Sequence, residues 1–151
     1  MRLYVIYDEH CDRSEEQYGD GRYDYSWEEN YSSDLKYILL DSRDSDDYSR
    51  YESIDVDFTP KIGDELYVVV VNYDTGDSFG RAYGRISIVD VFDDQEKANA
   101  FARYITDDAK RNSKKYSFEF LGREVHACWK GYFESFNYAD VYPLSIRSKY
   151  Q

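Results

Sequence analysis

The fold is decided by one stretch of the sequence, ELYVVVVNY at residues 65–73. Four consecutive valines place apolar side chains on both faces of an extended strand, and valine favours strands. A strand of this kind is typical of the middle of a sheet that is covered on both sides. Turn residues follow at 74–77, and residues 85–92 have a second strand pattern, so we predict an antiparallel pair over residues 65–92.

A helix is predicted at about residues 93–111. Asp93 is the expected N-cap, and Glu96, three residues later, completes a capping-box pattern. Apolar residues then recur at helical spacing, and basic residues at 110, 111, 114 and 115 suit the negative end of the helix dipole. This basic cluster is therefore interpreted as a feature of the helix end, not as a nucleic-acid-binding patch. One core is expected between sheet and helix, formed by Val68, Val69, Val70, Val71, Ile86, Ile88, Phe101 and Ile105.

The predicted fold class is α+β: a mainly antiparallel sheet with one principal helix (about 93–111) and an acidic, tyrosine-rich insert. The remaining strands are expected at residues 2–7, 34–40, 116–120, 124–129 and 140–146. The 151 residues fit a single domain, 1–151. Within it we expect an acidic, partly mobile segment at 8–58 and a compact body at 60–147.

Charge is distributed unevenly along the chain. The protein has 31 Asp and Glu against 19 Lys and Arg, a net charge of -12. Residues 8–58 hold 17 acidic and 5 basic residues, which accounts for the whole net charge, and they also contain seven tyrosines and Trp27. Such a balance argues against direct binding to nucleic acid or to an anionic membrane, because both depend on Lys and Arg.

Compartment is inferred from three sequence features. The longest apolar run, at residues 66–71, is far too short to span a membrane, and the N-terminal apolar stretch is too short for a signal-peptide core. Cys11 and Cys128 are then most simply reduced thiols. We therefore expect a cytoplasmic protein.

Two small motifs suggest chemistry, but their context disagrees. Residues 76–80, GDSFG, match the nucleophile-elbow pattern around Ser78, yet Gly84 interrupts the helix that such an elbow requires, which favours a glycine-rich hairpin loop with positive φ. His10-Cys11 and His126-x-Cys128 could supply four zinc ligands or a Cys–His dyad, but adjacent residues of a strand point to opposite sides. We expect no metal, no cofactor and no catalysis by Ser78 or Cys128.

The acidic, aromatic segment is the strongest functional pattern. Carboxylates spaced along a surface can imitate a phosphate backbone, and aromatic side chains among them can fill pockets on a partner. The predicted partner is a protein with a basic nucleic-acid-binding groove; the alternative interpretation is a solvated, solubilising surface. The candidate contacts are Asp20, Asp24, Glu28, Glu29, Asp44, Asp46 and Asp47, with Tyr23, Tyr25, Trp27 and Tyr48 as anchors.

A second hypothesis is a small-molecule or nucleotide-signal binding protein. Its site would be the loop from Gly76 to Gly84, with arginines for phosphate and aromatic rings for stacking. The candidate residues are Tyr73, Gly76, Ser78, Phe79, Arg81, Arg85 and Trp129. A hydrolase that uses Ser78 and His126 is a third hypothesis.

Residues 73–80, YDTGDSFG, and residues 129–135, WKGYFES, resemble a pattern in small uncharacterised phage and mobile-element proteins. The resemblance covers about residues 65–146, and no functional residue is transferred from it. The composition is also similar to that of acidic phage anti-restriction and anti-CRISPR proteins that imitate DNA. No activity is attached to the first resemblance. The compositional similarity, together with the acidic aromatic segment, implies a non-enzymatic phage-type inhibitor of a host defence effector, acting in the host cytoplasm.

Overall fold

The computed structural model describes residues 1–16, 26–40, 50–76, 80–111, 117–120, 123–126 and 135–148, with side chains over 1–13, 28–40, 50–75, 80–107 and 136–148. Most of these residues lie in strands. The elements are β1 (Arg2–Glu16), β2 (Ser26–Leu39), β3 (Arg50–Asp55), β4 (Glu65–Gly76), β5 (Gly80–Phe92), α1 (Gln95–Arg111), β6 (Ser117–Phe120), β7 (Arg123–His126) and β8 (Ser135–Arg147).

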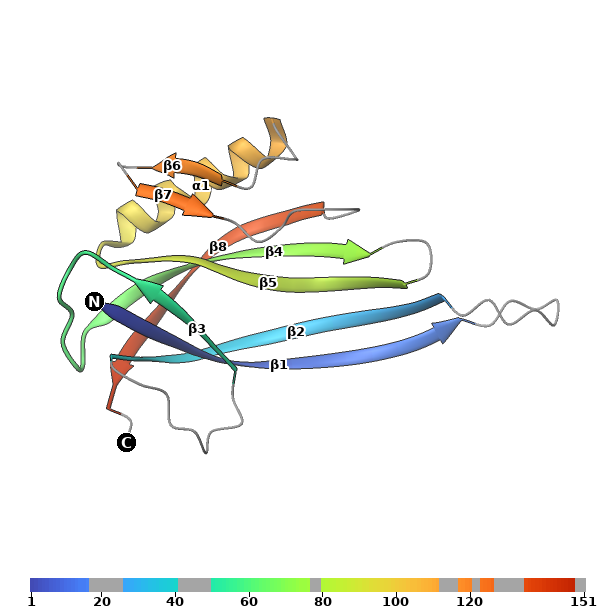
Figure 1. The fold of residues 1–151 in the computed structure, drawn as a ribbon, viewed down its shortest axis with the longest axis horizontal. Coiled ribbons are helices and arrows are strands. Elements are labelled where there is room, and N and C mark those ends of the chain that lie inside the picture. The colour runs from blue at the N-terminus through green and yellow to red at the C-terminus, as the bar shows by residue number, and fades with distance from the viewer. Residues whose placement is uncertain are drawn as a thin grey trace.

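Six strands form one mixed sheet in the order β3-β1-β2-β5-β4-β8, and β6 and β7 form a separate pair. Strand β2 runs parallel to two neighbours: its residues 27–30 pair with β5, and its residues 38–39 pair with β8. Strands β2, β5, β4 and β8 therefore close into a ring. In Figure 1 the long β1–β2 ribbon runs below β4 and β5, while α1 lies on their other side.

The prediction of an α+β fold with an acidic insert is wrong. The helix has 17 residues, whereas β1 alone has 15 and the sheet has six strands. The acidic third is no insert, because β1, β2 and β3 belong to the same sheet as β4. Polar stretches such as residues 8–16 have no apolar alternation, so only their ladder hydrogen bonds to neighbouring strands make them extended.

The prediction of a central strand is confirmed. Strand β4 lies between β5 and β8 and is antiparallel to both, so residues 65–92 do form an antiparallel pair. Three of the other predicted strands are too short where the sequence is polar, whereas those predicted at 116–120 and 124–129 correspond to β6 and β7. The strand predicted at 2–7 extends to Glu16, the one predicted at 34–40 begins at Ser26, and the one predicted at 140–146 begins at Ser135.

The helix is present, but its predicted start is wrong. Helix α1 begins at Gln95, and the cap is Asp94, not Asp93. The Oδ1 atom of Asp94 accepts hydrogen bonds from the backbone N–H groups of Glu96 (2.8 Å) and Lys97 (3.3 Å). With Asp94 as the cap, Lys97 occupies the third helical position, so the predicted capping box with Glu96 does not form.

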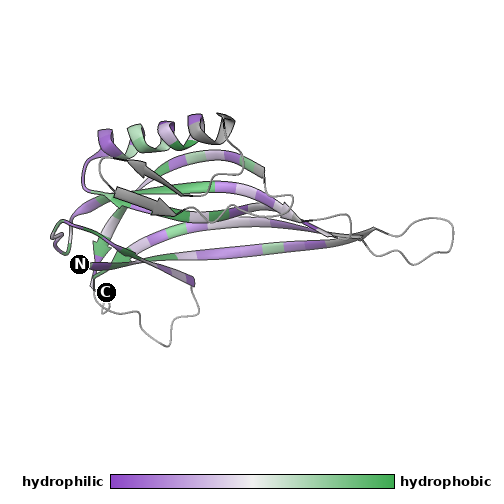
Figure 2. Ribbon diagram, turned by 45° about the horizontal axis from the view of Figure 1, so that its top comes forward, coloured by the Kyte–Doolittle hydropathy of each residue, from purple (hydrophilic) through white to green (hydrophobic). Residues whose placement is uncertain are grey.

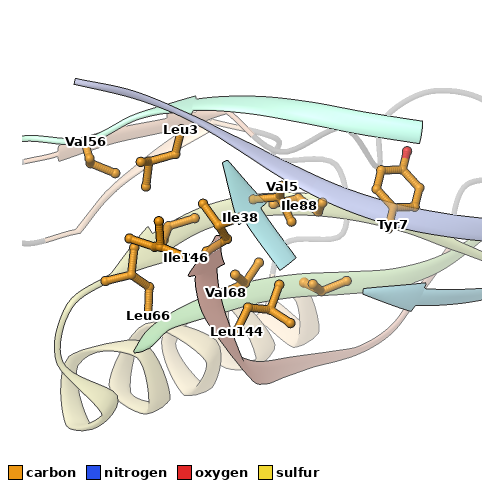
Figure 3. Close-up of a cluster of buried hydrophobic side chains, with 12 residues drawn as sticks. Leu3, Val5, Tyr7, Ile38, Val56, Leu66, Val68, Ile88, Leu144 and Ile146 are labelled. Carbon is orange, nitrogen blue, oxygen red and sulfur yellow. The ribbon is translucent and has the colours of Figure 1, made fainter. Parts of the chain in front are cut away.

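The prediction of one core is also wrong, because successive valines of β4 enter two different clusters on its two faces. The interior cluster, drawn in Figure 3, comprises Leu3, Val5, Tyr7, Ile38, Val56, Leu66, Val68, Val70, Ile88, Val91, Leu144 and Ile146. The helix-side cluster comprises Val69, Val71, Val89, Phe92, Ala98, Phe101, Ala102 and Ile105. Ile86 packs against the interior cluster. The period of two in a strand therefore divides the predicted core into two layers.

Hydropathy follows this layering. In Figure 2 apolar residues gather where the strands and the helix stack, while the long extensions of the strands are mostly hydrophilic. Within the residues that the structure describes, no helix is long and apolar enough to cross a membrane.

The two clusters should contribute to stability independently. Val70, which is 3% exposed, lies in the interior cluster, and Ile105, which is 0% exposed, lies in the helix-side cluster. We expect Val70→Ala and Ile105→Ala each to lower the free energy of unfolding by about 1–4 kcal/mol, through lost transfer energy and the cavity left behind. In the double variant the losses should add to within about 0.5 kcal/mol, as measured by chemical denaturation. A coupling well above that value would mean that the two clusters act as one core.

Candidate functional site

On the outer side of β1 and β2, opposite the interior cluster, four acidic residues form a surface that we call the acidic face: Asp8, Asp12, Glu28 and Asp34. Leu3, Val5 and Tyr7 point into the interior, so alternation turns Asp8 and Asp12 outward. Asp8 and Asp34 are direct cross-strand partners. Lys36 forms an ion pair with Asp8 at 2.9 Å, while Asp12 and Asp34 are exposed.

Beside the acidic face lies a tyrosine patch, formed by Tyr4, Tyr37 and Tyr51. Ile6 is the cross-strand partner of both Tyr37 and Tyr51, and it is only 1% exposed although it points away from the interior cluster. The rings of Tyr4 and Tyr51 are 5.9 Å apart, and the guanidinium of Arg147 lies 5.2 Å from the ring of Tyr37. The outer face therefore combines half-buried aromatic rings with carboxylates.

The inner face of the same strands changes from apolar to polar along their length. Figure 3 shows Tyr7 at one end of the interior cluster, away from Leu66 and Val56. Beyond Tyr7, the inward positions carry polar groups. We call this group the polar end cluster: Tyr7, Glu9, Tyr31, Ser33, Arg50, Glu52 and Arg85.

Glu9 is the most buried carboxylate of the polar end cluster. Its side chain is 4% exposed, and Arg50 Nη1 lies 3.2 Å from its Oε1 atom, while the side chain of Arg50 is 59% exposed. The two atoms are close enough for an ion pair but are not aligned as a hydrogen bond. Glu9 also lies opposite Ser33 in the β1–β2 ladder, which brings the hydroxyl to the same face.

Tyr31 lies between an anion and a cation. Its hydroxyl donates a hydrogen bond to Glu29 Oε2 at 2.5 Å, and the guanidinium carbon of Arg85 lies 4.5 Å from its ring centre. The bond to Glu29 favours the protonated phenol and, with burial, raises the pKa of Tyr31 to about 12. The ring thus remains neutral and holds Arg85 by a cation–π contact.

Gly84 allows β2 and β5 to approach at this point. Its φ of +73° lies in the left-handed region, and a Cβ atom there would be 2.6 Å from the carbonyl oxygen of Tyr31. Its N–H donates to Asp74 Oδ1 at 3.0 Å. The adjacent Arg85 is thereby brought over Tyr31.

Burial affects two further members of the polar end cluster. It raises the pKa of Tyr7, and the negative charges of Glu52 and Glu9 raise it further, while Arg50 and Arg85 oppose them. Burial also raises the pKa of the Glu52 carboxyl. Their geometric basis is the pairing of Tyr7 with Arg50 in the β1–β3 ladder and the contact of Arg85 with Tyr31.

The structure describes few of the predicted partner contacts. Glu28 lies on the acidic face, but Glu29 points inward and accepts the hydrogen bond from Tyr31. Trp27 is in β2 as the cross-strand partner of Glu15, without a described side chain. The others lie outside the described residues: Asp20, Asp24, Asp44, Asp46, Asp47, Tyr23, Tyr25 and Tyr48.

The predicted ligand-binding residues are described in part. Tyr73 and Arg85 are cross-strand partners, whereas Arg81 is exposed and lies opposite Gly76. Ser78, Phe79 and Trp129 lie outside the described residues. The loop hypothesis therefore named Arg85 but missed its actual neighbour, Tyr31.

The predicted metal ligands are described only in part. His10 and Cys11 are consecutive residues of β1, Cys128 lies outside the described residues, and the side chain of His126 is not described. Among the described side chains, no group of three or more His, Cys, Asp and Glu residues is arranged to hold a metal ion.

Most of the polar end cluster was not predicted from the sequence. Its only local sign is that Tyr7, Glu9 and Cys11 alternate with Asp8, His10 and Asp12. This alternation becomes informative once β1 is known to extend to Glu16.

Comparisons with protein-family models, with curated proteins and with solved structures give no match.

The raised pKa of Tyr31 should be visible in the pH dependence of stability. Because the folded-state pKa of about 12 exceeds the unfolded value of 10.0, the contribution of Tyr31 is fully present below pH 10.0 and is lost as the pH rises towards 12. We expect Tyr31→Phe to flatten the fall in stability over this range. Ring-labelled tyrosine NMR should show loss of one resonance titrating near pH 12; a resonance of Tyr31 that titrates near 10.0 would contradict the hydrogen bond to Glu29.

Removal of Arg50 should leave a buried, uncompensated carboxylate. We expect Arg50→Gln to lower the free energy of unfolding by about 1–3 kcal/mol, and Glu9→Gln to recover part of that loss in the double variant. Arg2→Gln is the matched control. Both side chains of the Arg2–Asp55 pair are exposed to solvent, so this substitution should not measurably change the free energy of unfolding. Equal effects of Arg50→Gln and Arg2→Gln in urea denaturation would show that the burial of Glu9 is unimportant.

Proposed function

We propose that the protein is a phage-type inhibitor of a host nucleic-acid-processing defence effector. It acts as an acidic nucleic-acid mimic, and the acidic face with the adjoining tyrosine patch occupies the effector's basic groove. The partner is a protein, and no enzymatic step is involved.

The observation that carries this proposal is the pairing of Asp8 with Asp34. Like charges directly opposite in an antiparallel ladder destabilise the sheet; Lys36 forms an ion pair with Asp8 at 2.9 Å, and Asp34 is exposed. Exposed Asp12 and Asp34 have no role in the interior. A charge arrangement that does not help folding is expected where a cationic partner compensates for it.

Geometry also favours a groove that normally receives a phosphate backbone. Along β1, Asp8 and Asp12 are about 13 Å apart in an extended strand, and β2 provides a second row beside them. Arginines and lysines that neutralise phosphates would meet two parallel rows of carboxylates. The rigidity of a paired ribbon reduces the entropy lost on binding.

The tyrosine patch adds apolar contact area, which the charges of the acidic face do not provide. Tyrosines bury a large apolar area and keep a polar hydroxyl, which makes them common anchors at protein interfaces. Tyr51 is 42% exposed and is therefore able to gain burial on binding. Rim charges then direct the approach, while aromatic anchors slow dissociation.

The proposal is tested with variants that change charge equally on two sides of the molecule. Asp12→Asn with Asp34→Asn neutralises the acidic face, and Asp93→Asn with Glu96→Gln neutralises two exposed acids near the start of α1. We expect the wild type to displace target DNA from at least one bacterial CRISPR or restriction effector complex, measured by fluorescence anisotropy. The acidic-face variant should lose about tenfold in affinity, because two carboxylates no longer meet the basic groove.

The helix-side variant should bind as the wild type does, and higher salt should weaken the wild type more than the acidic-face variant. Melting temperatures should stay nearly unchanged in both variants. Equal losses of affinity in both variants would mean that binding depends on net charge and not on the acidic face. If the wild type displaces DNA from none of the effectors tested, the inhibitor function is rejected.

The alternative function, binding of a small molecule or nucleotide signal, has support from a different observation. The Nε atom of Arg85 is buried and has no hydrogen-bond partner among the described residues.

A further inference from the structure

All the buried side-chain polar atoms that lack a hydrogen-bond partner in the described part of the chain lie in the polar end cluster. They are Glu9 Oε1, Ser33 Oγ and Arg85 Nε, contributed by β1, β2 and β5. Buried polar groups in proteins are nearly always hydrogen-bonded, and each exception costs stability. Three exceptions in one cluster indicate that another molecule supplies the missing partners.

Arg85 determines the charge that this molecule should carry. Within the described residues, no carboxylate lies at ion-pair distance from its guanidinium, which lies 4.5 Å from the centre of the neutral Tyr31 ring. The Nε–H group needs an acceptor. Because a guanidinium offers parallel donors to carboxylate and phosphate oxygens, an anionic group is the best partner.

Glu9 and Ser33 determine the rest of the ligand. Arg50 Nη1 lies 3.2 Å from Glu9 Oε1 but is not aligned as a hydrogen bond, so this oxygen, which only accepts hydrogen bonds, still lacks an aligned donor. Ser33 Oγ can donate or accept. Hydroxyl groups on a ligand could donate a hydrogen bond to Glu9 and also bond to Ser33. Since Glu9 is 4% exposed, a donor that reaches it must come from a group enclosed by the cluster.

We propose that the polar end cluster is a binding site for a small organic anion that also carries hydroxyl groups, the chemistry shared by sugar phosphates and nucleotides. The anionic group binds Arg85, and the hydroxyl groups donate to Glu9 and bond to Ser33. The ring of Tyr31 holds the Arg85 guanidinium by the cation–π contact, and Gly84 allows β5, the strand of Arg85, to approach β2.

This site is independent of the inhibitor function. It uses the inward residues of β1 and β2, whereas the acidic face uses the outward ones. Variants of Arg85 therefore leave the charges of the acidic face unchanged, and failure of one proposal does not imply failure of the other.

The probes are ribose 5-phosphate and inorganic phosphate, measured with the full chain by calorimetry and thermal unfolding. At a hundredfold excess over Kd, ribose 5-phosphate should raise the melting temperature by about 5 °C or more. Arg85→Gln should weaken its binding by about tenfold or more, since a charged hydrogen bond is lost. Arg81→Gln is the matched control on the same strand, and because Arg81 is exposed it should bind as the wild type does.

The hydroxyl contacts are tested separately. Ser33→Ala is a small change that should preserve the fold, and it should weaken ribose 5-phosphate but not inorganic phosphate. Circular dichroism and melting without ligand confirm that each variant is folded. Three outcomes overturn the proposal: ribose 5-phosphate does not bind, both probes bind equally tightly, or Arg81→Gln weakens binding as much as Arg85→Gln. If Arg85→Gln does not fold, Arg85→Lys replaces it, with the same expected loss because lysine lacks the paired donors.

Discussion

The arrangement of the whole molecule depends on strand β2, which pairs with two strands that lie on either side of β4. Its residues 27–30 pair with β5 and its residues 38–39 with β8, both in parallel. These two short ladders bring the N-terminal strands over the face of β4 opposite the helix, where Ile38 meets Ile146 in the interior cluster. Just beyond the first ladder, the backbone of β2 passes so close to β5 that a side chain at Gly84 would collide with the carbonyl of Tyr31. A residue without Cβ is thus required for the ring to close there.

Closure of the ring gives β1 and β2 two faces with different chemistry. Neighbouring residues have unlike surroundings: Asp8 and Glu28 face outward, whereas Glu9 is buried and Glu29 bonds to Tyr31. The same period of two that divides the valines of β4 between two clusters divides the acidic residues of β1 and β2 between two candidate sites. The high acid content of the N-terminal third therefore does not describe a single surface. Among the acidic residues of β1 and β2 whose side chains the structure describes, the outward ones are those available to a cationic partner.

The polar end cluster opposes folding, and the apolar layers compensate for it. Polar atoms of Glu9, Ser33 and Arg85 are removed from water without hydrogen-bond partners, which costs stability even though Glu9 keeps an ion pair with Arg50. The interior and helix-side clusters, with many side chains fully buried, offset that cost. A well-packed core beside such a cluster provides the stability needed to keep polar groups that do not help the protein fold.

The sequence by itself determined the features that depend on local pattern: the central strand at 65–73, its antiparallel partner, the existence of one helix, and the concentration of charge in residues 8–58. It also named Glu28 and Arg85 as candidate contact residues. Only the tertiary structure decided that the polar stretches of β1 and β2 are strands, that the core has two layers, and that Arg50 meets Glu9 and Arg85 meets Tyr31. The physical reason is that apolar periodicity is a local property of the sequence, whereas a polar strand is stabilised by ladder hydrogen bonds to strands that are distant in sequence. The partner strands decide which carboxylate is exposed and which is buried, and a local sequence pattern does not identify those partners.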